Sequence, residues 1–396
     1  MNIWNSIKRV SDFGILVQSP QLNWSEVVQR KNNIIGKFVG GKGPYLQKMG
    51  VDLAMGQAEF VSPQAIRVGE ETYEANRFLI GVGSESILPP FEGVEHGITS
   101  KELLFMEQLP KSMVVIGGGI IGMEFAHIFA SAGTKVTLLQ RGERVLKGED
   151  HETSRVIEDI SQKMGIDMKF RCHVTKIEKQ GQLRTVHING PEGESQIEAE
   201  VVLIATGRKP AVEGLNLSAA GVEYSPRGIQ VNDYLQTTAE RIYAAGDSIG
   251  GYMFTPIAAH QAKVAVRNAL KGNRVKPDYR YMTRAVFTHP PIGSVGLTEE
   301  EARNEGLDVA VGKLPYALSG TAILLGETEG QMKVIVDKKT RQLVGAHFVG
   351  QDADELIHLV TVAMKGKLTV DDFLEIIPVH PTLAESLIEM VRGIEA

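Results

Sequence analysis

A glycine-rich turn between an apolar run and a helical pattern is the feature that most constrains the fold of this chain. The apolar run is Met113–Ile116, residues 117–122 read Gly-Gly-Gly-Ile-Ile-Gly, and the helical pattern covers Met123–Ala132. A second apolar run follows at Lys135–Leu139. A strand, a glycine turn, a helix and a second strand in this order predict a β-α-β unit of a doubly wound parallel sheet.

Three glycines of the turn match the spacing G-x-G-x-x-G, and they are Gly117, Gly119 and Gly122. In this motif the first glycine allows a tight turn and the second lets backbone amides approach a pyrophosphate. The third allows the helix to pack closely on the strand. The amino end of the helix then offers unpaired N–H groups and a partial positive charge to the phosphates. Residues 113–133 therefore predict a site for a pyridine dinucleotide.

The residues after the second strand bear on which dinucleotide is bound. An NAD(H) site usually has an acidic residue there, which binds the ribose 2′-hydroxyl. This chain has Gln140 and Arg141, with Arg144 and Lys147 close behind. An uncharged amide followed by basic residues suits a 2′-phosphate better, so NADP(H) is favoured over NAD(H). A solvated basic loop is the alternative.

Composition excludes several other classes of protein. The formal net charge of −6 argues against nucleic acid or an anionic membrane as the main partner. No stretch approaches the roughly 18 unbroken apolar residues of a membrane span, and the start lacks the pattern of a signal peptide, so we expect a cytoplasmic protein. Cys172 is the single cysteine, so the sequence holds no intrachain disulfide and no CxxC motif, and we predict a packed thiol and no metal site.

Further motifs bring a family resemblance. Residues 237–247 read Thr-Thr-Ala-Glu-Arg-Ile-Tyr-Ala-Ala-Gly-Asp and resemble the second flavin motif of the pyridine-nucleotide disulfide oxidoreductases. Val201–Gly207 resembles the strand between the two nucleotide domains of that family, and Phe78–Ser84 resembles its weaker earlier copy. Residues 380–385, His-Pro-Thr-Leu-Ala-Glu, resemble the carboxy-terminal HPTxxE signature of dihydrolipoamide dehydrogenases and glutathione reductases.

The resemblance implies an α/β fold with two Rossmann-like nucleotide-binding domains and a C-terminal α+β dimerisation domain. Residues 1–107 with 237–280 would form the FAD-binding domain, 108–236 the NAD(P)-binding domain and 281–396 the dimerisation domain. The expected assembly is a homodimer, with FAD and NADP(H) as cofactors and a small-molecule electron acceptor or donor. The expected FAD-binding positions are Gly207, Gly246, Asp247 and Thr255.

The resemblance also implies catalytic roles for three residues. His380 would be the acid–base that serves the thiols across a dimer interface, and Glu385 would fix its tautomer. The alternative is a helix start with His380 as cap. Glu124 matches the family glutamate near flavin N5, with an exposed helical glutamate as the alternative.

Two family features are missing from this sequence. Relatives open with their own strand and a first G-x-G-x-x-G for FAD, followed by a C-x-x-x-x-C redox disulfide, and neither of these occurs ahead of residue 113 in this sequence. We therefore expect an incomplete FAD-binding domain. Ile120 stands where dihydrolipoamide dehydrogenases usually carry an aliphatic residue, although the subfamily stays open. The alternatives are a reductase with a shortened chain, a catalytically deficient dimer that binds only NADP(H), and a flavoprotein reducing a quinone, oxygen or a metal without a dithiol.

Overall fold

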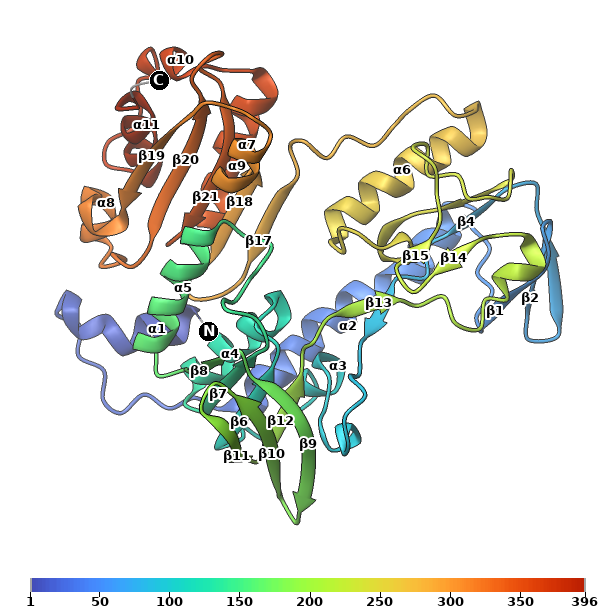
Figure 1. Ribbon diagram of the computed structural model, residues 1–396, viewed down its shortest axis with the longest axis horizontal. Coiled ribbons are helices and arrows are strands. Elements are labelled where there is room, and N and C mark those ends of the chain that lie inside the picture. The colour runs from blue at the N-terminus through green and yellow to red at the C-terminus, as the bar shows by residue number, and fades with distance from the viewer. Residues whose placement is uncertain (1, 395–396) are drawn as a thin grey trace. The chain divides into compact units, whose positions relative to one another are not determined.

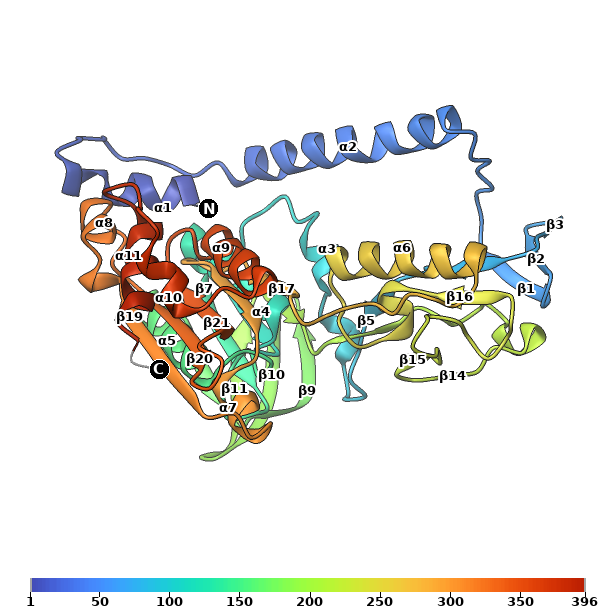
Figure 2. The ribbon, with the colours of Figure 1, turned by 90° about the horizontal axis from the view of Figure 1, so that it is seen from above.

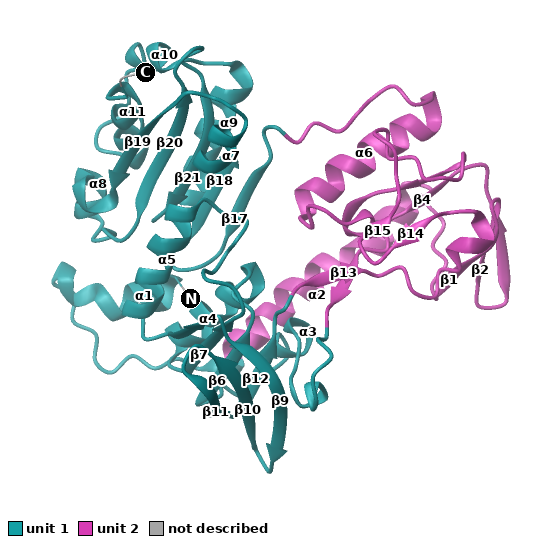
Figure 3. Ribbon diagram, in the orientation of Figure 1, with its two compact units in different colours: residues 1–25, 88–206, 280–396 teal, residues 26–87, 207–279 magenta. Residues whose placement is uncertain are grey.

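The structure is a computed structural model that describes residues 2–394. The chain forms two compact units (Figure 3). Unit 1 comprises residues 1–25, 88–206 and 280–396, and unit 2 comprises residues 26–87 and 207–279. Within the described residues, no helix is long and apolar enough to cross a membrane.

The predicted β-α-β unit forms the centre of unit 1. Its four-stranded parallel sheet has the order β12-β6-β7-β8, with β6 at Ser112–Ile116 and β7 at Lys135–Gln140. The outer strands are β12 at Val201–Ile204 and β8 at Asp167–Phe170. Helix α4, Ile120–Ala132, packs on this sheet, and α5, His151–Lys163, follows β7 in the chain. All four residues of β12 are buried, as expected for a parallel sheet covered on both faces.

Three antiparallel strands follow β8 in the chain. They are β9 at His173–Gln180, β10 at Leu183–Gly190 and β11 at Gly193–Ala199. Figure 1 shows them as green arrows beside the parallel sheet. Their inward residues Ile177, Val186 and Ile188 share a buried cluster with Val114 of β6. This small sheet therefore covers part of the parallel sheet.

The C-terminal part of unit 1 is a five-stranded antiparallel sheet of order β17-β18-β21-β20-β19 (Figure 1). Helices α9 and α11 pack against it with a continuous apolar core. The strands are β17 (Thr283–Val286), β18 (Ile292–Gly296), β19 (Val309–Pro315), β20 (Gln331–Asp337) and β21 (Leu343–Val349). The helices are α7 (Glu299–Asn304), α8 (Gly320–Leu324), α9 (Ala353–Gly366), α10 (Val370–Leu374) and α11 (Leu383–Arg392).

The C-terminal sheet and the parallel sheet share one core. Val286, Ile292 and Val349 of the C-terminal sheet belong to the same buried cluster as Val115 and Leu138 of the parallel sheet. This shared core explains why both sheets fall within unit 1. The predicted α/β fold with Rossmann-like regions and a C-terminal α+β domain is confirmed.

Unit 2 is built on a short parallel pair, β4 at Phe78–Ile80 and β16 at Ile242–Ala244. Helix α6, Thr255–Lys271, packs along this pair, as Figure 2 shows. The remaining strands form small antiparallel sheets: β1 (Ala58–Ser62), β2 (Ala65–Val68), β3 (Glu71–Glu74), β5 (Ser84–Ser86), β13 (Arg208–Pro210), β14 (Tyr224–Ser225) and β15 (Gly228–Ile229).

The two compact units divide the chain differently from the assigned domains, since residues 1–25 and 88–107, assigned to the FAD-binding domain, fall within unit 1. Residues 208–236 were assigned to the NAD(P)-binding domain, but they pack within unit 2. Strand β13 pairs with β5, and Val212, Leu217 and Ile229 share a buried cluster with Ile242 of β16. Hydrophobic burial therefore holds this segment against β16, which lies in the segment that resembles a flavin motif.

The first part of the chain holds the helix that the sequence did not reveal. Helix α1 covers Asn2–Arg9 and is followed by a 3₁₀ turn at Val10–Phe13. Helix α2 then runs from Trp24 to Lys48, although only Val28 of it is buried. The segment contains several glycines and a proline at position 44, which mask a helical pattern. The last short elements are α3, Ser100–Leu103, and a 3₁₀ turn at Val94–His96.

Candidate functional site

The glycine turn has the geometry that its spacing predicts. Gly117 has a φ of 112°, and a Cβ atom there would lie 2.4 Å from the carbonyl oxygen of Ala205. A Cβ at Gly122 would lie 1.9 Å from the carbonyl oxygen of Gly117. Both positions are therefore closed to any side chain. Gly119 differs, because its Cβ would meet nothing within 4 Å.

The open space beside Gly119 lies at the amino end of helix α4. Gly119 is the N-cap residue, no side chain caps the helix, and its first turn has no acidic residue. The first N–H groups of an α-helix have no partner within the helix, and here they face open space. A pyrophosphate fits this arrangement, since it needs close approach to backbone donors and no competing carboxylate.

The side chain of Gln140 ties the turn to the loop that follows β7. Its Oε1 accepts from the amide of Gly118 at 3.2 Å, and its Nε2 donates to the carbonyl oxygen of Arg144 at 2.8 Å. The amide of Leu146 also donates to the oxygen of Gly118 at 2.8 Å. Gln140 was expected among the cofactor-binding residues. In the structure its side-chain amide stabilises the turn and the following loop.

The three basic residues after Gln140 have different environments. Arg141 and Lys147 are exposed, and neither side chain forms a hydrogen bond or ion pair with the residues that the structure describes. Arg144 is half-buried and donates to the carbonyl oxygens of Glu149 and Lys147 and to the hydroxyl of Ser154. Two cations next to the turn are thus available to an anionic ligand, and the third is used within the loop.

In unit 2, three of the four expected flavin residues line one pocket. The pocket has a volume of about 350 Å³ and lies where β16 ends and α6 begins. Gly246, Asp247 and Thr255 line it. The amino end of α6 has no side-chain cap and no acid in its first turn, so it presents partial positive charge to this space. Gly207 does not line the pocket; its carbonyl oxygen accepts from the amide of Ile87 at 3.0 Å.

Asp247 is held by two residues that the sequence motifs did not include. The hydroxyl of Ser84 donates to Asp247 Oδ2 at 2.6 Å, and the Nε of Arg208 donates to Ser84 Oγ at 2.7 Å. Arg208 also donates to the carbonyl oxygen of Ser84 at 2.6 Å. Oδ1 of Asp247 accepts nothing from residues 2–394, so this oxygen can accept a hydrogen bond from a ligand hydroxyl. This acceptor therefore fits the flavin role expected of Asp247.

His380 and Glu385 meet as expected. The imidazole Nδ1 lies 2.9 Å from Glu385 Oε2 and 3.1 Å from Oε1. Glu385 is the third residue of helix α11, whose N-cap hydroxyl, from Thr382, accepts from the Glu385 amide. The side chain of His380 is 78% exposed while that of Glu385 is 21% exposed. A carboxylate that accepts from Nδ1–H leaves Nε2 free to face solvent or a partner.

Glu124 lies on α4, one turn after Gly119, and it is half-buried. Its Oε1 accepts from the amide of Phe287 at 3.0 Å. Burial raises the pKa of this carboxyl, and the hydrogen bond from Phe287 opposes that shift in part. The alternative of an exposed helical glutamate is therefore excluded, while its relation to a flavin stays a prediction.

Cys172 is the buried thiol that the sequence predicted. It follows β8 and precedes β9, is 7% exposed, and its Sγ lies 3.3 Å from the carbonyl oxygen of Phe170. Burial raises the pKa of the thiol. A buried thiol with a raised pKa is a poor nucleophile, so Cys172 has the character of a packing residue.

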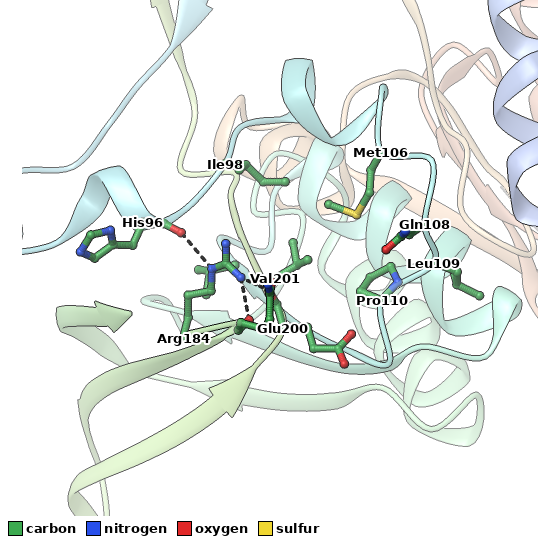
Figure 4. Close-up of a pocket in the computed structure, with 11 residues that line it drawn as sticks. His96, Ile98, Met106, Gln108, Leu109, Pro110, Arg184, Glu200 and Val201 are labelled. Atoms are coloured by element: carbon green, nitrogen blue, oxygen red, sulfur yellow. Dashed lines mark hydrogen bonds between the residues drawn. The ribbon is translucent and has the colours of Figure 1, made fainter. Parts of the chain in front are cut away.

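A separate pocket of about 460 Å³ lies at the opposite end of the parallel sheet, near the first residues of β6 and β12. Figure 4 shows the guanidinium of Arg184 between the carbonyl oxygen of His96 and the backbone of Glu200. Dinucleotides bind at the carboxyl ends of parallel strands, so this pocket is not the dinucleotide site.

A buried ion cluster was not visible in the sequence. Lys333 of β20 lies 3.0 Å from Asp150, the N-cap of α5, and 2.9 Å from Glu299 of α7. Arg284 of β17 pairs with Glu149 at 3.1 Å. The side chains of Lys333 and Asp150 are 5% and 3% exposed. The pairs of Lys333 with Asp150 and of Arg284 with Glu149 each join residues more than 130 positions apart, so no local motif could have indicated the cluster.

Known sequence families match most of this chain. Residues 9–262 match the family described as pyridine nucleotide-disulphide oxidoreductase, and residues 282–391 match the dimerisation domain of the same family.

Three proteins illustrate the similarity. A dihydrolipoyl dehydrogenase of Bacillus subtilis is 33% identical over 397 aligned residues, which cover 98% of this chain and 86% of that protein. A mercuric reductase of Bacillus cereus is 37% identical over 94% of this chain and 60% of its own length. The flavoprotein disulfide reductase RclA from Escherichia coli, described as HOCl-induced, has a solved structure with a TM-score of 0.88 and 32% identity. The match covers 94% of this chain and 86% of RclA.

The family matches agree with three features of the structure. These are the glycine turn, the pocket at Asp247 and the pair of His380 and Glu385. This chain belongs to the flavin-dependent pyridine nucleotide-disulphide oxidoreductases and is an oxidoreductase of that type.

Proposed function

We propose that this chain passes hydride between NADP(H) and FAD, as a dihydrolipoamide dehydrogenase-like member of its family. The observation that carries the proposal is the amino end of α4, which is open at Gly119 and has two unpaired cations, Arg141 and Lys147, on the adjoining loop. When bound, the nicotinamide and the flavin supply the hydride chemistry. The residues of this chain bind and orient the two cofactors.

The preference for NADP(H) rests on the loop after β7. Strand β7 ends at Gln140, whose side chain is neutral and already hydrogen-bonded. Position 140 therefore places no carboxylate near the ribose 2′-position of a dinucleotide bound at this turn. The side chains of Arg141 and Lys147, which have no partner within residues 2–394, can pair with a phosphate there. Charge-assisted bonds of this kind are stronger than neutral ones, which favours NADP(H).

The proposal for FAD rests on unit 2. Asp247, held by Ser84, and the uncapped amino end of α6 line the same pocket. The carboxylate suits the hydroxyls of a ribityl chain, and the helix end suits the negative charge of a reduced flavin. Gly246 contributes by close packing, because a Cβ there would lie 3.0 Å from Ala258 of α6.

For the step between the flavin and the small-molecule acceptor or donor, we propose His380 as the acid–base and Glu385 as the residue that orients it. The chain would act as a homodimer. The open Nε2 side of His380 and the match of residues 282–391 to a dimerisation domain support this role. We propose Glu124 as the carboxyl near the flavin, supported by its raised pKa in a partly buried position.

A substitution at Arg141 tests the cofactor preference. Arg141→Glu should weaken NADPH binding by about tenfold to a hundredfold, because it replaces an attractive charge-assisted bond worth roughly 1.5–3 kcal/mol. NADH binding should change much less. The matched control is Arg155→Glu, a reversal of charge at an exposed residue of α5. Equal losses for NADPH and NADH would reject Arg141 as a reader of the 2′-phosphate.

A second candidate is a flavoprotein that reduces a quinone, oxygen or a metal without a dithiol. The observation that favours it is Cys172, the single cysteine of this sequence, which is buried. A third candidate is a dimer that binds NADP(H) without turnover. The absorption spectrum of the purified chain separates these: a colourless protein that still binds NADPH supports the third candidate. A yellow protein that oxidises NADPH with a quinone, and not with lipoamide or glutathione, supports the second.

A further inference from the structure

The loop of residues 141–150 joins β7 to helix α5, and it carries both cations of the proposed 2′-phosphate site. Its third basic residue, Arg144, has no ligand-facing role in the proposed function. The inference below rests on the proposed NADP(H) preference and concerns how the loop is held.

The donors of Arg144 are directed into the loop and its helix. Nη2 donates to the carbonyl oxygen of Lys147 at 2.9 Å. Nη1 donates to the carbonyl oxygen of Glu149 at 3.0 Å and to the hydroxyl of Ser154 at 2.9 Å. The guanidinium thus joins two backbone positions of the loop to the first turns of α5. A planar fork of fixed donors can hold three acceptors at once, whereas a lysine ammonium on a flexible stem holds them poorly.

The backbone of Arg144 is fixed as well. Its carbonyl oxygen accepts from Gln140, whose other amide atom accepts from Gly118 in the glycine turn. Arg144 is therefore bonded to the dinucleotide turn on one side and to the residue Lys147 on the other.

The far end of the loop is held by buried charges. Glu149 pairs with Arg284 at 3.1 Å, and Asp150 pairs with Lys333 at 3.0 Å. Buried side chains therefore hold most of the loop between the glycine turn and these two ion pairs. Val145 and Leu146 are buried at its middle. The carbonyl oxygen of Lys147 accepts from Arg144, and its exposed side chain has no hydrogen bond or ion pair within residues 2–394.

We propose that Arg144 is a positioning residue for cofactor selectivity: it does not touch the 2′-phosphate, and it holds the loop so that Arg141 and Lys147 can. Selectivity between NADP(H) and NAD(H) then depends on the hydrogen bonds of the guanidinium and not on its charge alone. Preorganised groups bind more tightly, because the ligand does not have to order them.

Two variants of the full chain test this, with adenosine 2′,5′-bisphosphate and AMP as probes in titration calorimetry at one fixed salt concentration. These probes differ by the 2′-phosphate and need no flavin. Arg144→Lys keeps the charge and loses the fork. Ser154→Ala keeps Arg144 and removes one of its acceptors. Arg155→Lys, at an exposed arginine of the same helix, is the control for a change of arginine to lysine.

We expect Arg144→Lys to lower the ratio of the two affinities by at least about tenfold, and Ser154→Ala to lower it by about threefold, with AMP binding unchanged in both. The control should keep the wild-type ratio. Loss of stability alone would not alter the ratio, so thermal unfolding of each variant separates that effect.

Three other outcomes would contradict either the positioning role of Arg144 or the NADP(H) preference. If Arg144→Lys lowers the ratio and a folded Ser154→Ala does not, Arg144 binds the phosphate directly and the inference is wrong. If neither variant changes the ratio, the inference is also wrong, and the proposed NADP(H) preference stands. If the wild-type chain binds both probes equally, the NADP(H) preference fails and the inference fails with it.

Discussion

The open position at Gly119 allows a substitution that removes dinucleotide binding and leaves the fold intact. Gly119 has a φ of −79° and a ψ of −175°, which any residue adopts, and a Cβ there meets nothing within 4 Å. Asp and Asn are both favoured N-cap residues. Gly119→Asp and Gly119→Asn should therefore match or exceed the stability of the wild-type chain.

The two variants differ in one charge, placed where the pyrophosphate would lie. Two like unit charges about 4 Å apart repel by about 1 kcal/mol in bulk water and about 4 kcal/mol near a protein surface. Gly119→Asp should therefore bind NADPH more weakly than Gly119→Asn by between about fivefold and about a thousandfold. Steric exclusion by either side chain adds to the loss relative to the wild type.

Fluorescence titration with NADPH and urea denaturation measure the two effects separately. The expected result is a loss of binding with an unchanged or raised denaturation midpoint. Wild-type affinity in both variants would show that the amino end of α4 is not the pyrophosphate site. A binding loss that is equal in the two variants and tracks a fall in stability would refute the electrostatic reasoning.

Three further predictions concern stability. Gly122→Ala should cost at least about 1–3 kcal/mol in urea denaturation, because its Cβ would lie 1.9 Å from a backbone oxygen; an unchanged midpoint would contradict this. Burial lowers the pKa of His127 to about 4, below the usual 6.5, so its contribution to stability is present above pH 6.5 and is lost as the pH falls toward 4. That loss is about 3 kcal/mol, and His127→Gln should flatten the curve of unfolding free energy between these pH values. Lys333→Met should destabilise the chain by about 3–5 kcal/mol, since it leaves the buried Asp150 without its cation, and Asp150→Asn in the same chain should recover part of the loss.

Local sequence rules were sufficient for the β-α-β unit. The strand expected at Met113–Ile116 is β6, Ser112–Ile116, and the helix expected from Met123 begins at Ile120 as α4. The glycine spacing fixes the turn, because only a residue without a side chain fits at positions 117 and 122. The pair of His380 and Glu385 is local too, since the residues stand five positions apart across the start of one helix.

Other features depended on which residues fold against each other. From sequence, Gln140, Arg141, Arg144 and Lys147 looked like one polar and basic group beside a phosphate. The structure divides them, because Gln140 and Arg144 find hydrogen-bond partners in the turn, the loop and α5, whereas the side chains of Arg141 and Lys147 find none among the described residues. Hydrogen-bond partners of this kind are set by the path of the backbone, which residue types do not specify.

By itself, the sequence determined the dinucleotide turn, the β-α-β unit around it and the family of the chain. These follow from backbone conformation and hydrophobic period within short windows, where one residue type excludes the alternatives. Only the tertiary structure decided that residues 208–236 pack in unit 2, that Ser84 and Arg208 hold Asp247, and that Lys333 joins Asp150 to Glu299. Those contacts join residues far apart in the chain, and burial of charge and apolar surface selects them only when the whole core forms.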